Sequence, residues 1–108
     1  MNTIEVGFRR GIKVNGKYLK LGRMEFKYFS LLCISLNRPV TYDQFMDYMY
    51  ECTEDEPYRE VLSVFTYKLR RKLKEVGFPS QNLKTVYVYG YGFRLADNDT
   101  TVKLLKVV

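Results

Sequence analysis

The residues of this chain that could do chemistry are cations and aromatic rings, spaced along one long helix and the segment that follows it. Between Pro57 and Leu95, a basic amphipathic helix precedes a stretch rich in tyrosine and glycine. Cationic side chains attract phosphates, and arginine can pair with guanine edges in a major groove. A short β-hairpin beside such a helix can reach the neighbouring minor groove. The pattern therefore predicts a surface that binds DNA.

The candidate DNA contacts lie opposite the apolar stripe of this helix and at the hairpin tip. At about 100° per residue, the stripe predicted to be core runs from Tyr58 through Leu62, Leu69 and Leu73 to Val76. Phe65 belongs to the same stripe. The candidates that project elsewhere, with two wing-tip tyrosines, are Ser63, Val64, Tyr67, Lys68, Arg70, Arg71, Lys74, Tyr89 and Tyr91.

These candidates have different expected roles. Lys68 and Arg71 can reach guanine edges or phosphates, whereas Arg70 and Lys74 are expected at phosphates. The alternative for all four is a solvated cationic helix face. Ser63 could bond a phosphate, and Val64 and Tyr67 could pack on a thymine methyl. Tyr89 and Tyr91 could lie against the sugar-phosphate backbone of DNA. Half-burial would explain Val64 equally well, and packing of Tyr89 and Tyr91 on each other in the hairpin would explain those two residues equally well. Arg94 is expected to be structural.

Catalytic and metal chemistry find little support. The chain has no histidine, no metal-binding cluster, no nucleophile paired with a base and no phosphate loop. Cys33 sits among leucine and isoleucine residues as a buried hydrophobe would, and Cys52 lies in an acidic segment. Both thiols are expected to be reduced. We therefore expect no enzyme activity, no cofactor and no metal.

Charge is segregated into blocks along the chain. Residues 1–40 carry 8 basic and 2 acidic side chains, residues 41–56 carry 6 acidic and no basic ones, and residues 57–95 carry 8 basic and 2 acidic ones, so the net charges are +6, −6 and +6. Residues 96–108 balance to zero, which leaves +6 for the whole chain. Two basic blocks around an acidic one suggest two separate contact surfaces.

Length and hydropathy predict one small cytoplasmic domain. A chain of 108 residues forms one core. No apolar run approaches the roughly 20 residues that span a bilayer, and the N-terminus lacks the pattern of a signal peptide, so no membrane contact is expected. We assign residues 1–95 to a folded domain and residues 96–108 to a tail that could be an added strand or a partner contact.

The coarse secondary structure is β-β-β-α-α-α-β-β, an α+β fold. Three short strands are predicted over 4–8, 11–14 and 17–21, with a hairpin turn at Asn15-Gly16. One helix begins near Arg23, a second begins at a Thr41–Gln44 capping box, and a third covers 58–76 and stops at Gly77. A strand over 83–88, a turn at 89–92 and a strand over 93–95 complete the order.

In this order, the chain resembles the winged-helix DNA-binding (effector) domain of the OmpR/PhoB response-regulator family, over roughly Ile4 to Leu95. The markers are Leu21 with Glu25-Phe26, the run Leu69-Arg70-Arg71-Lys72-Leu73, and Thr85-Val86 followed by Gly90-Tyr91-Gly92-Phe93-Arg94-Leu95. The resemblance implies a winged helix-turn-helix: an N-terminal antiparallel sheet of four strands, a three-helix bundle and a C-terminal β-hairpin wing.

The resemblance also implies how such a domain would work. Helix 58–76 would enter the major groove, and the wing, about 87–93, would touch the minor groove. The loop carrying Glu51, Glu54, Asp55 and Glu56 would contact RNA polymerase, although a solvated loop that its charge keeps off DNA explains it as well. Tandem copies would sit on direct repeats of double-stranded DNA.

Several positions depart from the family pattern. Glu60 and Val61 stand where the family usually has arginine and threonine, Tyr67 and Lys68 replace arginine-type residues, and Tyr89 stands in place of the wing arginine. The chain carries no receiver domain, so it is expected to be either an excised effector domain or a stand-alone protein. A sequence-specific transcription regulator is the first functional hypothesis. A protein-binding winged-helix adaptor or inhibitor, acting on RNA polymerase or another regulator, is the second.

Overall fold

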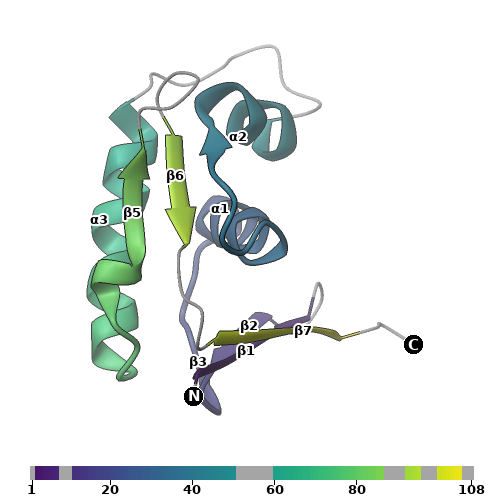
Figure 1. Cartoon of the computed structure of the whole chain (residues 1–108), viewed down its shortest axis with the longest axis vertical. Coiled ribbons are helices and arrows are strands. Elements are labelled where there is room, and N and C mark those ends of the chain that lie inside the picture. Colours follow the sequence, from purple (N-terminus) through teal and green to yellow (C-terminus); the bar gives the residue numbers. More distant parts are fainter. Residues whose placement is uncertain (1, 8–10, 51–59, 87–91, 96–99, 106–108) are drawn as a thin grey trace.

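Two small sheets and three helices make up the part of the chain that the computed structural model describes, residues 2–7, 11–50, 60–86, 92–95 and 100–105 (Figure 1). The α+β fold class expected from the sequence is confirmed. In chain order the elements are β1 (Asn2–Gly7), β2 (Gly11–Val14), β3 (Lys17–Tyr18), α1 (Arg23–Ile34), β4 (Val40–Thr41), α2 (Tyr42–Met49), α3 (Glu60–Glu75), the 3-10 turn η1 (Ser80–Asn82), β5 (Leu83–Val86), β6 (Gly92–Leu95) and β7 (Thr100–Leu105).

The first sheet has the strand order β3-β2-β1-β7. Its first three strands are antiparallel, as expected, and Asn15 and Gly16 take the positive φ values, 51° and 82°, that a tight hairpin turn requires. The third strand is shorter than predicted: it ends at Tyr18, because Leu19 turns into the core while its N–H still bonds to the Ile12 carbonyl at 2.9 Å.

The fourth strand of this sheet was not predicted in this form. The resemblance implied four antiparallel N-terminal strands, but β7 comes from the C-terminal tail and pairs with β1 in parallel, from Asn2↔Thr100 to Gly7↔Leu105. The tail residues 100–105 are therefore a strand. Sequence reasoning could not choose between a strand and a partner contact, because β7 depends on a neighbour almost a hundred residues away.

The second sheet has the order β4-β6-β5. Its β5–β6 hairpin was predicted, and the register runs from Leu83↔Leu95 to Val86↔Gly92. The two-residue strand β4 was not predicted; it pairs with the start of β6 through Val40↔Phe93. This strand joins the end of α1 to the start of α2, so the hairpin is attached to the helix-turn-helix unit by backbone hydrogen bonds.

Local signals in the sequence place the ends of the helices. The Thr41 hydroxyl accepts from the Gln44 N–H, and the Gln44 side chain accepts from the Thr41 N–H, so the expected capping box opens α2. At the end of α3, Gly77 has φ +80°, and the N–H of Phe78 bonds to the Leu73 carbonyl at 2.9 Å. The N–H of Gly77 bonds to the Lys74 carbonyl at 3.2 Å, which completes a Schellman stop with Phe78 buried.

The core lies between the helices and the inner faces of both sheets. Leu62, Leu69 and Leu73 of the predicted stripe are at most 1% exposed, while Phe65 and Val76 are partly buried against them. Tyr58 of that stripe lies outside the described residues. The stripe also contains Thr66, which is 2% exposed and which was not predicted because threonine is polar.

Candidate nucleic-acid interface

One side of α3 is open to solvent along the whole described length of the helix. The residues on it that are exposed, called the helix face below, are Ser63, Val64, Tyr67, Lys68, Arg71, Lys74 and Glu75. The opposite side of the same helix carries the buried Leu62, Thr66, Leu69 and Leu73. The helix face holds three cations and one carboxylate, that of Glu75 in the last turn, and it includes two large exposed apolar side chains, Val64 at 47% and Tyr67 at 62%.

Two members of the helix face contact one another. Tyr67 and Arg71 are four residues apart, so they are neighbours on the helix surface. The Arg71 guanidinium carbon lies 5.9 Å from the centre of the Tyr67 ring, a cation–π distance. An arginine held over a ring loses less rotational freedom when it binds a planar acceptor such as a guanine edge.

The other two cations of α3 are engaged with the body of the domain. Lys72 Nζ lies 2.7 Å from Glu25 Oε2 of α1, and both side chains are partly buried. Arg70 donates from Nε at 3.1 Å and from Nη2 at 2.7 Å to the carbonyl oxygen of Leu83, the first residue of β5. Arg70 was expected to contact phosphate; two of its N–H groups are already engaged inside the protein.

A buried polar contact fixes α3 against α1. The Thr66 hydroxyl lies 2.7 Å from the Leu62 carbonyl, to which it donates its one proton. The Tyr28 hydroxyl, next to the Thr66 oxygen, must then be the donor in the contact between them. Because Tyr28 is fully buried, rotation of α3 about its axis would take the Thr66 acceptor away from the Tyr28 hydroxyl in the core, whereas the bond from Thr66 to Leu62 would move with the helix.

The base of the β5–β6 hairpin is bonded to α3 through Arg70 and Leu83, and Figure 1 shows β5 and β6 between α3 and β4. The wing-tip candidates Tyr89 and Tyr91 lie outside the described residues, as do Glu51, Glu54, Asp55 and Glu56 of the acidic loop, so the predictions made for these six residues stay predictions. Arg94 pairs with Lys84 across the hairpin, and its expected structural role also stays a prediction.

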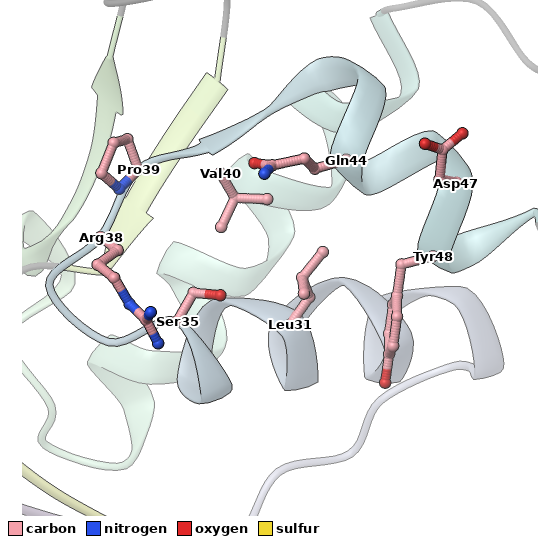
Figure 2. A pocket seen from close by; sticks show the side chains of 8 residues that line it. All are labelled: Leu31, Ser35, Arg38, Pro39, Val40, Gln44, Asp47 and Tyr48. Carbon is pink, nitrogen blue, oxygen red and sulfur yellow. The ribbon is translucent and has the colours of Figure 1, made fainter.

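A concave region lies between α1, β4 and α2, apart from the helix face. Its volume is about 530 Å³, and Figure 2 shows Arg38 and Asp47 at opposite ends of a groove lined by Leu31, Val40 and Tyr48. Burial raises the pKa of the Tyr48 phenol above its usual value, so this hydroxyl stays neutral at physiological pH. β6 and β5 separate β4 from the side where α3 lies (Figure 1).

The described residues hold no set of groups that suggests metal or thiol chemistry. Within the described ranges, no three histidine, cysteine or carboxylate side chains gather where they would hold a metal ion. Cys33 is buried, and burial raises the pKa of its thiol, so the unreactive protonated form is favoured. Cys52 lies outside the described residues. Among the helices that the structure describes, none is both long and apolar enough to cross a bilayer.

Comparison with known proteins agrees with this geometry. Residues 16–93 match the family model described as "Transcriptional regulatory protein, C terminal". The chain belongs to this family. The resemblance to the OmpR/PhoB effector domain is thereby confirmed, and with it the coarse class, a DNA-binding domain of transcription regulators, which is not a class of enzymes.

Individual relatives point the same way. The cell cycle transcriptional regulator CtrA of Caulobacter vibrioides is 30% identical over 83 residues, which are 77% of this chain and 36% of that protein. The cell cycle response regulator CtrA of Brucella anthropi is 30% identical over 86 residues, 80% of this chain and 37% of that protein. This chain therefore spans little more than a third of the length of these relatives.

A solved structure shares the fold. The DNA-binding domain of the response regulator AdeR, crystallised in complex with an intercistronic region, superposes with a TM-score of 0.68 at 23% identity. The match covers 87% of this chain and 94% of that one. At this identity the likeness shows the fold, and it confirms the winged-helix architecture expected from the sequence.

Proposed function

We propose that this domain binds double-stranded DNA sequence-specifically as part of a transcription regulator, with α3 in the major groove and the wing, residues 87–93, at the minor groove. The observation that carries the proposal is the helix face: three cations and two apolar side chains on a rod whose other side is core. At 1.5 Å per residue, α3 is roughly 24 Å long, and a major groove about 12 Å wide admits such a rod.

The members of the helix face would divide the work. Arg71, steadied by the Tyr67 ring, would pair with a guanine edge, and Lys68 one turn away would reach a second base or a phosphate. Lys74 and Ser63 would contact phosphates, which position the helix without reading sequence. Val64 and Tyr67 would pack on thymine methyl groups. At the wing tip, Tyr89 and Tyr91 would lie against the sugar-phosphate backbone.

Two further partners belong to the proposal. The loop with Glu51, Glu54, Asp55 and Glu56 would present its negative charge to a basic surface of RNA polymerase, and two copies would bind in tandem on direct repeats. Footprints one helical turn apart, about 10 base pairs centre to centre, would support the tandem arrangement. A single protected half-site at saturating protein would contradict it.

The test is a selection from a random duplex pool followed by gel shifts of the selected duplex across a salt series. If about 4–6 phosphates are neutralised, log K should fall with log salt at a slope of roughly −4 to −5. Arg71→Ala should weaken binding by about 1–3 kcal/mol on the selected site. Enrichment without a motif, or affinity that does not depend on salt, would contradict the proposal.

The exposed apolar side chains favour a second candidate function. Val64 is about half exposed and Tyr67 is more than half exposed, and both could pack against a partner protein as well as against thymine methyl groups. In that case the domain is an adaptor or inhibitor acting on RNA polymerase or another regulator. It would then bind a purified polymerase, and it would show no duplex binding near about 0.1 M salt.

A further inference from the structure

A winged helix that uses two grooves needs a fixed angle between its recognition helix and its wing. Arg70 joins the two: it belongs to α3 and bonds to the first residue of β5. We propose that Arg70 is a positioning residue that sets the wing against α3, and that its guanidinium does not bind phosphate. This inference rests on the proposed function, because its consequence is read on DNA.

The geometry of the contact favours this role. Nε and Nη2, two donors held in one plane, both point at the Leu83 carbonyl oxygen, at 3.1 Å and 2.7 Å. Two donors on one acceptor restrict both the guanidinium plane and the carbonyl direction. Leu83 itself is 1% exposed, so its side chain fixes the same residue from the core side. Side chain and carbonyl together hold the base of β5.

The neighbouring lysine gives the contrast. Lys72 also points away from the helix face, but it ends on Glu25 of α1 and not on the hairpin. Lys72 therefore fixes α3 to the bundle, and Arg70 fixes α3 to the wing. Among the hydrogen bonds of the described residues, the exposed cations Lys68, Arg71 and Lys74 bond neither to α1 nor to the hairpin, so they remain available for DNA.

A small error at the base of the wing is enlarged at its tip. β5 continues for three residues beyond Leu83, and at about 3.3 Å per residue its far end lies roughly 10 Å from the clamped carbonyl. A tilt of about 10° at the base would move that end by roughly 2 Å, which is enough to break a hydrogen bond to DNA. The clamp is thus expected to matter for minor-groove contacts and much less for major-groove contacts.

Arg70→Lys is the discriminating substitution, because it keeps the charge and removes the two-donor fork. A lysine replaces an arginine well at a phosphate but cannot hold a carbonyl through two planar donors. We expect binding to the selected duplex to weaken roughly 5- to 20-fold, hydroxyl-radical protection in the minor groove to disappear, and protection of guanine N7 from dimethyl sulfate to remain. The salt slope should stay within about 0.3 of the wild-type value, because no phosphate contact is lost.

Lys72→Arg is the matched control, since it also exchanges one cation for another on α3 but at a residue tied to α1. It should leave both footprints intact. If Arg70→Lys binds within about twofold of wild type with both footprints retained, Arg70 acts as a phosphate contact or does nothing, and the proposal is wrong. Arg70→Met then distinguishes a phosphate contact from no role, since loss of a phosphate contact lowers the slope of log K against log salt by about 0.9.

A measurement without DNA keeps this inference separate from the proposed function. In the free protein, residual dipolar couplings should place β5 and β6 at a single angle to α3, and Arg70→Lys should change that angle or average it. Tyr28→Phe, which removes a buried hydrogen bond between α1 and α3, should not. If the wild type fails to bind DNA while the couplings change as expected, DNA binding is refuted but the clamp stands. Unchanged couplings in Arg70→Lys would overturn the clamp whatever DNA does.

Discussion

The outer face of the first sheet and the helix face of α3 carry the same kinds of residue in different arrangements. Across the sheet, register places Tyr18, Lys13, Glu5 and Lys103 in one row, with the carboxylate between two lysines. Lys13 also lies over the Tyr18 ring at 4.7 Å, as Arg71 lies near Tyr67 on α3. The sheet row has its carboxylate between its two lysines, whereas the helix face has three cations and one carboxylate, Glu75, at its C-terminal end.

This difference indicates which of the two basic surfaces is suited to bind DNA. Both basic blocks have the same net charge of +6 in the sequence, so composition does not distinguish them. A row of alternating signs stabilises a sheet through cross-strand pairs and protects its edge, where Lys103 sits on β7. A predominantly positive face on a protruding helix instead produces a field that a polyanion can use. The sheet row is thus the natural internal control for the helix face.

The largest expected difference between the two surfaces is for charge reversal. Arg71→Glu replaces a base contact with a repelled carboxylate and should weaken binding to the selected duplex by at least about 3 kcal/mol, roughly 100-fold. Lys103→Glu makes the same change of charge in the sheet row and should cost less than about threefold. Gel shifts at one salt concentration measure both. Equal losses would mean that net charge alone drives binding.

The next largest difference is for removal of one lysine. Lys68→Ala should cost about 1–3 kcal/mol if Lys68 reads a base, or lower the salt slope by about 0.9 if it binds phosphate. Lys13→Ala should change neither the affinity nor the slope, because Lys13 is paired with Tyr18 and lies beside Glu5 in the sheet. Titrations at four salt concentrations give both quantities. A lowered slope in Lys13→Ala would add the sheet to the DNA contact surface.

A smaller difference is expected for the two rings. Tyr67→Leu keeps an apolar side chain but removes the cation–π contact to Arg71, so binding should weaken by about 0.5–1 kcal/mol, or two- to fivefold. Tyr18→Leu removes the shorter contact to Lys13 and should leave DNA affinity unchanged. If Tyr67→Leu binds as wild type does, the ring does not prepare Arg71.

The smallest effect should come from uncovering the sheet lysines. Glu5→Gln removes the carboxylate between Lys13 and Lys103 and makes the row uniformly basic. Affinity for an unrelated duplex should rise by a few tenths of a kcal/mol, about 1.5- to 2-fold, while affinity for the selected duplex barely changes. Competition between the two duplexes measures the ratio. A gain on the selected duplex alone would contradict the passive role given to the sheet.

Local patterns predicted the helices and their faces well. The 3.6-residue period correctly placed Leu62, Leu69 and Leu73 inside and Tyr67 and Arg71 outside, and the stop at Gly77 follows from one residue that tolerates positive φ. These features depend on residues within a few positions of one another. For the same reason the wing hairpin could be predicted from its own residues.

What could not be predicted depends on contacts between distant segments. β7 beside β1, β4 beside β6 and the reach of Arg70 to Leu83 all arise only once the chain has folded. Burial of Thr66 was not predicted, because a threonine does not count in an apolar pattern even when its position lies on the stripe. In the structure its hydroxyl is bonded to Tyr28 and Leu62. Two of five cations on α3 are occupied by the body, and no helical wheel shows which two.

The central claim is that DNA binds on the helix face and not on the sheet row. A nitrogen-15 heteronuclear NMR titration with the selected duplex, at about 0.15 M salt, tests it directly. We expect the largest chemical-shift changes at Ser63, Tyr67 and Arg71 and in β5 and β6, with the signals of Glu5, Lys13 and Lys103 unmoved. Shifts concentrated on β1, β2 and β7, with α3 unchanged, would contradict it.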